Sequence, residues 1–131
     1  MELLNKLLKT NLLPLAFIGD SVHTLFVREY CLENSVDKME NYHNKSSKYC
    51  KASSQAKVLS LIIDKLTDEE KDIVRRGRNA KPKHQAKNAS SSDYTYATAF
   101  EVLIGFLYLS KNDERLKEIL NLSISLLENG N

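Results

Sequence analysis

Two acidic residues, Asp20 and Glu101, each lie within an otherwise apolar segment that is typical of a helix in a protein core. Asp20 lies within residues 15–22, and Glu101 lies within residues 97–105. An acid among core residues loses solvation, so it persists only where a cation or a hydrogen-bond donor meets it. The Lys or Arg nearest to Asp20 along the chain is Arg28, two helical turns away. The pattern therefore predicts a divalent metal site, shared by the two carboxylates where their helices pack together.

Purely structural roles are also open for these acids. Asp20 could form an ion pair with Arg28 or Lys45, and the second carboxylate could accept a hydrogen bond from Tyr94 or Tyr96. These alternatives need no metal ion, so only the spatial arrangement of the side chains can separate them from the metal site.

Other kinds of reactive site find little support in the chain. His23 follows Asp20 by less than one turn and could reach the edge of the metal site, although a place in the core or on the surface also fits. No grouping of Ser, His and Asp, or of Cys and His, is typical of a nucleophilic triad. The chain has no Gly-rich phosphate loop, which argues against a nucleotide triphosphatase.

Positive charge is concentrated in the middle of the chain. Residues 41–92 contain 12 Lys and Arg against 5 Asp and Glu, although the net charge of the whole chain is only +2. Six bases and no acid lie within residues 74–92, namely Arg75, Arg76, Arg78, Lys81, Lys83 and Lys87. Such a segment on a nearly neutral protein indicates a site for a polyanion, with a solvated loop as the alternative.

Helices must position these residues, because the chain of 131 residues has only four Gly and two Pro and lacks a convincing strand. Apolar periodicity predicts helices over 3–8, 15–33, 37–50, 54–66, 67–76, 94–110 and 113–127. Ser53 or Ser54 could cap the fourth helix, and the run from Thr67 to Glu70 has the form of a capping box. Gly77 would end the fifth helix, leaving a long loop over 78–93. We expect one all-α domain over residues 1–131, with six or seven helices.

The chain also lacks the usual signs of export or membrane insertion. No apolar run reaches the roughly 18 residues that a spanning helix needs, and the first residues do not resemble a secretory signal. Cys31 and Cys50 have no metal-like spacing and are interpreted as free thiols in a reducing compartment. These features predict a cytoplasmic protein.

The two acidic segments resemble known sequences. Residues 15–22 resemble the signature helix of the ribonuclease III family, usually Leu-Glu-Phe-Leu-Gly-Asp, and residues 99–105 resemble the second metal-binding helix of that family. Stretches within 45–56, 76–81 and 94–101 are similar to the Mini-ribonuclease III subfamily, and no double-stranded-RNA-binding domain follows them. The resemblance covers roughly residues 12–110 and implies a single ribonuclease III-type endonuclease domain.

The resemblance implies a homodimeric endonuclease that cleaves double-stranded RNA with Mg²⁺, which Mn²⁺ could replace. The resemblance to the subfamily implies the precursor of 23S ribosomal RNA as the substrate, and it leaves open whether a ribosomal protein assists. This chain departs from the larger family at Ala16 and Thr98, where the family has acids. With two carboxylates per site, water and substrate phosphate must complete the coordination shell, which suits Mg²⁺.

By the same resemblance, Asp20 and Glu101 are the catalytic metal ligands, with Asp20 closest to the reaction. The candidates for RNA contact are basic residues and hydrogen-bond donors: Lys45, Ser46, Lys48, Gln55, Arg76, Arg78, Asn79, Lys81, Lys83 and Lys87. The Ser and Gln donors could equally have capping or surface roles. Phe17, Val22 and Phe26 are candidates for the dimer seam, or they fill the core of the monomer.

Two other functions remain open. The first is a non-catalytic RNA-binding module with a ribonuclease III-like fold, although the presence of both acids argues against it. The second is an unrelated helical protein that binds DNA. A duplex-RNA binding and cleavage test with and without Mg²⁺ separates the three.

Overall fold

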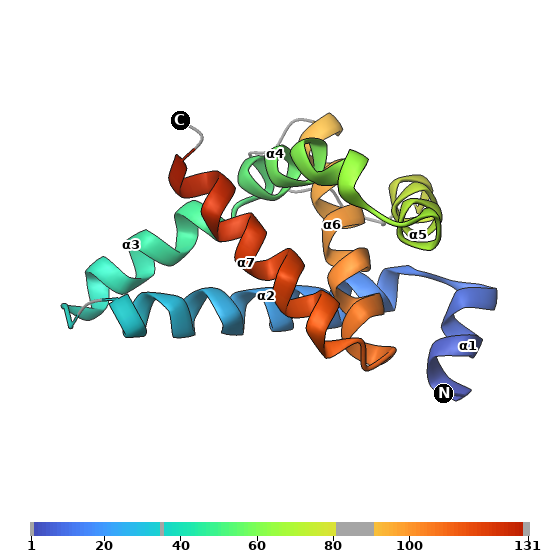
Figure 1. Ribbon diagram of the computed structural model, residues 1–131, viewed down its shortest axis with the longest axis horizontal. Helices are drawn as coiled ribbons and strands as arrows, with labels where there is room; N and C mark the ends of the chain where they lie inside the picture. Colours follow the sequence, from blue (N-terminus) through green and yellow to red (C-terminus); the bar gives the residue numbers. More distant parts are fainter. Residues whose placement is uncertain (1, 35, 81–90, 130–131) are drawn as a thin grey trace.

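The chain folds into seven α-helices and one short 3₁₀ helix over the residues that this computed structural model describes, 2–34, 36–80 and 91–129 (Figure 1). No strand occurs within those ranges, which confirms the all-α expectation. The helices are α1 (Glu2–Thr10), α2 (Leu13–Asn34), α3 (Met39–Cys50), α4 (Ala52–Ile62), η1 (Ile63–Lys65), α5 (Asp68–Asn79), α6 (Ser91–Leu109) and α7 (Asp113–Asn129).

Helix α6 is the centre of the fold, as its uniformly apolar sequence predicted. It packs against α2, α4, α5 and α7, and in Figure 1 it stands across the long α2. Its most deeply buried side chains are at most 1% exposed: Phe100, Val102, Leu103, Ile104 and Leu107. A helix that is apolar on nearly every side needs neighbours on every side, and these four helices supply them.

Two glycines allow α2 and α6 to cross in backbone contact. A Cβ atom on Gly19 would lie 1.8 Å from the carbonyl oxygen of Glu101, and one on Gly105 would lie 2.0 Å from the carbonyl oxygen of Leu15. Only glycine permits this approach, because any side chain would overlap the facing backbone. The crossing brings the backbone that precedes Asp20 directly against Glu101.

Gly77 does not end α5, contrary to the prediction from sequence. The helix continues to Asn79, and Gly77 is buried against α6, where an added Cβ would lie 3.1 Å from both the Cα of Ala99 and the Cβ of Val102. The glycine serves close helix packing and takes no positive φ. The segment between the two helices is shorter than the predicted loop 78–93, since α5 extends to 79 and α6 begins at 91. Residues 81–90 lie outside the described part of the chain.

The capping box at the start of α5 is confirmed. The backbone N–H of Glu70 donates to Oγ1 of Thr67 over 3.1 Å, and the backbone N–H of Thr67 donates to Oε1 of Glu70 over 2.9 Å. Arg115 of α7 also donates to the Glu70 carboxylate, over 2.8 and 2.9 Å. One buried acid therefore caps α5 and ties it to α7.

The predicted serine cap of α4 is wrong. Helix α4 begins at Ala52, its N-cap residue is Lys51, and no side chain caps it. Ser54 lies inside the helix, and its hydroxyl donates instead to the backbone carbonyl of Lys48 in α3. Ser54 thus braces the sharp corner between α3 and α4.

Candidate active site

Asp20 of α2 and Glu101 of α6 form a hydrogen bond with each other through their side chains. The glycine-mediated crossing places them there, because Gly19 seats the preceding turn of α2 on the backbone of Glu101 itself. Asp20 is exposed, whereas Glu101 is half-buried. The two acids singled out in the sequence therefore meet in the fold, one at the surface and one behind it.

The pKa of Glu101 is raised to about 8, first by burial and then by the charge and hydrogen bond of Asp20. Two carboxylates in contact cannot both ionise easily, so one retains a proton at neutral pH unless a cation takes its place. Gln55 of α4 opposes this shift with a hydrogen bond to Glu101. Among the alternatives considered for Asp20, Lys45 lies instead with its Nζ 5.3 Å from the ring centroid of Tyr30.

This donor set fits a hard divalent cation that keeps most of its water. Within the described ranges, no group of three or more His, Cys, Asp or Glu side chains could hold a metal ion. Mg²⁺ commonly binds one or two carboxylates and completes its shell with water and phosphate oxygens. Ala16 and Thr98 are buried and add no carboxylate, so Asp20 and Glu101 are the acids available here.

His23 lies in the core beneath these carboxylates. Its side chain is 1% exposed, its Nδ1 lies 3.0 Å from Nε2 of Gln55, and its ring meets that of Phe100 edge-on at 5.1 Å. Burial lowers the pKa of His23 to about 4, although the nearby charge of Asp20 acts in the opposite direction. The imidazole is therefore neutral at physiological pH and belongs to the core.

Two residues predicted to contact RNA point inward. Gln55 is only 3% exposed, and its amide is engaged with His23 and Glu101. Ser46 is 8% exposed, and its hydroxyl donates to the carbonyl of His43 over 3.1 Å. A direct contact with a nucleic acid does not fit either side chain, because neither presents its polar group to solvent.

The remaining candidates for RNA contact divide into four groups. The guanidinium of Arg76 donates to the carbonyl of Leu8 and so links α5 to α1. Arg78 and Asn79 are exposed at the end of α5, and the Arg78 guanidinium lies 4.7 Å from the ring centroid of Tyr96. Lys81, Lys83 and Lys87 lie outside the described residues.

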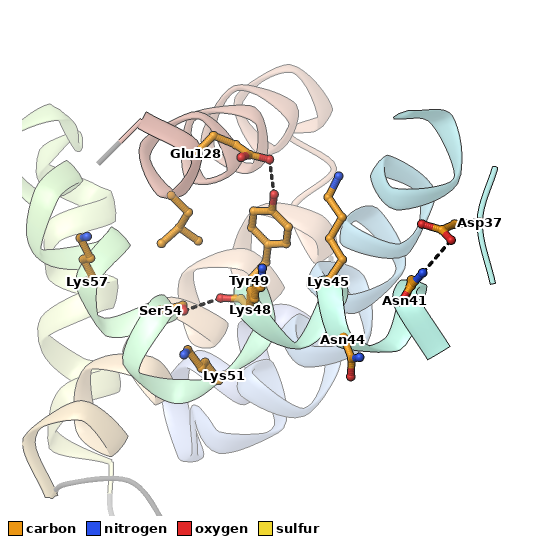
Figure 2. A pocket seen from close by; sticks show the side chains of 11 residues that line it. Asp37, Asn41, Asn44, Lys45, Lys48, Tyr49, Lys51, Ser54, Lys57 and Glu128 are labelled. Atoms are coloured by element: carbon orange, nitrogen blue, oxygen red, sulfur yellow. Dashed lines mark hydrogen bonds between the residues drawn. The ribbon is translucent and has the colours of Figure 1, made fainter. Parts of the chain in front are cut away.

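Lys45 and Lys48 border a hollow of about 620 Å³ between α3, the start of α4 and the end of α7 (Figure 2). Lys51 and Lys57 also line this hollow, and sequence reasoning did not single them out. We call these four residues the lysine group. They are scattered over thirteen positions of the chain, so only the bend between α3 and α4 gathers them around one cavity.

The two acids that border the same hollow are engaged by neutral donors. Asp37 accepts hydrogen bonds from the side chain of Asn41 over 2.7 Å and from the backbone N–H of Lys38 over 2.8 Å. Glu128 accepts from the hydroxyls of Tyr30 and Tyr49, and the contact with Tyr49 is drawn in Figure 2. With four lysines against two acids, the hollow carries a net positive charge.

The three residues considered for the dimer interface differ in how exposed they are. Phe17 is 79% exposed, whereas Val22 and Phe26 are half-buried and pack against the core. Leu25 and Leu32 lie on the same helix and are 62% and 60% exposed. Helix α2 thus presents an apolar strip, Phe17, Leu25 and Leu32, to solvent.

Both cysteines are free thiols, as predicted. Among the described residues, no helix combines the length and the apolar character that crossing a membrane requires.

The fold agrees with one family of proteins. Residues 13–112 match the Ribonuclease III domain family, and the chain belongs to that family. The resemblance noted in the sequence is thereby confirmed.

Within this family, the chain is similar to a smaller group of proteins. A Mini-ribonuclease 3 of Thermoanaerobacter sp. (strain X514) is 45% identical over 129 residues, which cover 97% of this chain and 91% of the relative. A Mini-ribonuclease 3 of Staphylococcus aureus (strain NCTC 8325 / PS 47) is 43% identical over 119 residues, covering 89% of each chain. The crystal structure of a protein from Fusobacterium nucleatum superposes with a TM-score of 0.80 at 31% identity, over 88% of this chain and 93% of that one.

Proposed function

We propose that this protein is a metal-dependent endoribonuclease that cleaves double-stranded RNA, with Asp20 and Glu101 holding Mg²⁺. The observation that carries the proposal is the contact between these two carboxylates at the α2–α6 crossing, in a chain that shares its family with proteins named Mini-ribonuclease 3. From the sequence resemblance we also infer that the substrate is the precursor of 23S ribosomal RNA, processed in the cytoplasm.

The two acids of the site have different roles. A bound Mg²⁺ would supply a water of lowered pKa and positive charge beside the scissile phosphate. Asp20 is exposed and can therefore meet a phosphate that approaches from solvent. Glu101 is half-buried behind it, and its raised pKa means that binding a cation there releases a proton.

We assign RNA binding to the lysine group around the α3–α4 corner, together with Arg78, Asn79 and the lysines at 81, 83 and 87. Duplex RNA is recognised mainly through its shape, its phosphates and its 2′-hydroxyls, which lysine ammonium groups suit as donors. The excess of lysines over acids around the hollow supports this assignment, because a net positive charge attracts the phosphates of a nucleic acid.

A homodimer would present two such sites to the two strands of a duplex, which is itself nearly two-fold symmetric. The apolar strip of Phe17, Leu25 and Leu32 on α2 is the surface that we assign to the second copy. Exposed apolar side chains gathered on one helix are typical of a protein interface.

The proposal is tested with Asp20→Asn, which keeps the size of the side chain and removes its charge. The variant should lose cleavage of a duplex RNA in Mg²⁺ and still shift the duplex in a gel, because the lysine group is untouched. Asp113→Asn, an exposed acid at the start of α7, is the matched control and should cleave normally. Cleavage by Asp20→Asn near the wild-type rate would refute the assignment, and a wild-type protein that binds RNA without cutting it would identify a non-catalytic module.

A further inference from the structure

We propose that His23 and Gln55 form a positioning pair, in which His23 fixes the orientation of the Gln55 amide and the amide in turn holds the Glu101 carboxylate beside Asp20. This inference rests on the proposed function, because it concerns the second ligand of the same metal site. It assigns a role to two buried polar side chains that the reaction itself does not require.

The pair joins the helices that build the site. His23 comes from α2, three residues after Asp20, Gln55 comes from α4, and Glu101 comes from α6. His23 and Gln55 are 1% and 3% exposed, so the protein alone must satisfy their polar atoms. Their hydrogen bond of 3.0 Å, between Nδ1 of His23 and Nε2 of Gln55, satisfies one polar atom of each side chain.

The protonation state of His23 determines the direction of this bond. The imidazole is neutral because burial lowers its pKa, so the ring carries a proton on only one of its nitrogens. Nε2 of Gln55 has hydrogens and no lone pair to offer, so it donates to Nδ1 and the ring proton is on Nε2 of His23.

The same amide nitrogen serves Glu101. Gln55 lowers the pKa of Glu101 through a hydrogen bond, and only the amide N–H group can donate to an ionised carboxylate. An amide turned the other way would face both the carboxylate and Nδ1 with its carbonyl oxygen, which accepts and cannot donate. A ring protonated on Nε2 presents only an acceptor at Nδ1, so this tautomer of His23 disfavours the amide orientation that would repel an ionised Glu101.

Holding the carboxylate in this way matters for metal binding. Glu101 is buried and next to a second acid, both of which disfavour its charged form. Groups that hydrogen-bond a metal ligand orient it and favour its binding form, and losing one typically weakens metal affinity by 10- to 100-fold. We expect losses of this size when either member of the pair is removed.

The test compares two variants of His23. His23→Asn keeps an oxygen acceptor near the position of Nδ1, whereas His23→Leu has a similar bulk and no acceptor. Mn²⁺ binding to the intact protein without RNA is measured by calorimetry, together with the Mg²⁺ concentration that gives half-maximal cleavage. We expect His23→Leu and Gln55→Met to lose about 10- to 100-fold in Mn²⁺ affinity, and His23→Asn to bind Mn²⁺ more tightly than His23→Leu.

Two further measurements separate positioning from general stability. Val58→Ala removes a buried side chain of α4, one turn after Gln55, and should lower thermal stability without changing Mn²⁺ affinity. The ¹⁵N shifts of His23 in the wild-type protein should show a neutral ring protonated on Nε2. This measurement uses the wild-type protein without metal, so it does not depend on whether any variant folds.

Each outcome decides the proposal. Unchanged Mn²⁺ affinity in His23→Leu and Gln55→Met, equal losses in His23→Asn and His23→Leu, or a proton on Nδ1 of His23 would overturn it. So would a wild-type protein that does not bind Mn²⁺. A wild-type protein that binds Mn²⁺ but cleaves no RNA would refute the proposed function alone, because the affinity series would still judge the pair.

Discussion

The two neighbouring acids of the proposed site are solvated very differently. Asp20 is exposed, whereas Glu101 is half-buried and has its pKa raised to about 8 by burial and by Asp20. The folded state without metal therefore keeps a proton on the pair that the unfolded chain would release near pH 4.5. Beneath the pair, His23 shows the opposite behaviour, since burial lowers its pKa to about 4.

These shifts predict how stability depends on pH in the absence of metal. Between pH 6.5 and 8 the folded state holds up to one more proton than the unfolded state at Glu101, so stability falls as pH rises, by about 1.5 kcal/mol over this window. His23 partly offsets this loss only near pH 6.5, where the unfolded chain still protonates it, and it is neutral in both states at higher pH. Urea denaturation in EDTA should show this loss in the wild-type protein and not in Glu101→Gln. Parallel pH profiles for the two proteins would contradict the cause given for the shift.

At the scale of elements, the site exists because α2 and α6 cross in backbone contact. Gly19 and Gly105 each face a carbonyl oxygen of the other helix, so the distance between the helices is set by the absence of side chains. The corner between α3 and α4 has a comparable role on another part of the molecule, where it gathers the lysine group around its hollow (Figure 2).

The crossing predicts that Gly19→Ala is severely destabilising. The new Cβ would lie 1.8 Å from the carbonyl oxygen of Glu101, and backbone cannot move aside as a flexible side chain can, so we expect a loss of roughly 3 kcal/mol or more. Gly77→Ala is the matched control, because its Cβ would meet Ala99 and Val102 at 3.1 Å. Urea unfolding should rank Gly19→Ala well below Gly77→Ala, and equal stabilities would contradict this account of the crossing.

The lysine group predicts a specific change in salt dependence. Lys48→Gln with Lys51→Gln should weaken binding to duplex RNA and reduce the slope of log affinity against log salt, by about 1 for each phosphate that is no longer neutralised. Lys6→Gln with Lys9→Gln removes the same charge from α1 and should leave the slope nearly unchanged. Equal slopes for the two double variants would show that the duplex does not reach the hollow.

At the scale of the whole molecule, a single catalytic face cannot cut both strands of a duplex at once. The apolar strip on α2 offers a surface on which a second copy would bring a second site. Phe17 is the clearest member of the strip, because its exposed fraction of 79% shows that the monomer core does not need it.

Sedimentation equilibrium at micromolar concentration should therefore give a mass of twice 14.9 kDa. Phe17→Asp should shift the protein to the monomer mass without unfolding it, since the new charge would be buried only in the assembled state. Leu61→Asp, at another exposed apolar position, should remain dimeric. A wild-type mass near 14.9 kDa would contradict the assigned interface.

Local chemistry in the sequence was sufficient to predict most helices and to single out the two acids of the candidate site. The capping box of Thr67 and Glu70 forms between residues three apart, and the uniformly apolar run of α6 specifies burial whatever its neighbours are. Asp20 and Glu101 were recognisable because a carboxylate in an apolar segment needs a partner. Such signals depend on a few consecutive residues, so the sequence alone determined them.

Only the tertiary structure decided what depends on contact between distant segments. A glycine such as Gly77 is typical of a helix end, yet α5 continues through it to Asn79. The glycine is there because α6 leaves no room for a side chain at this position. Gln55 resembles a surface donor, yet packing turns it toward His23 and Glu101. Lys51 and Lys57 were not distinguishable from other surface lysines until the bend between α3 and α4 brought them around one hollow. Burial, close approach and pKa shifts all arise from neighbours far along the chain, and no local pattern records which neighbours those are.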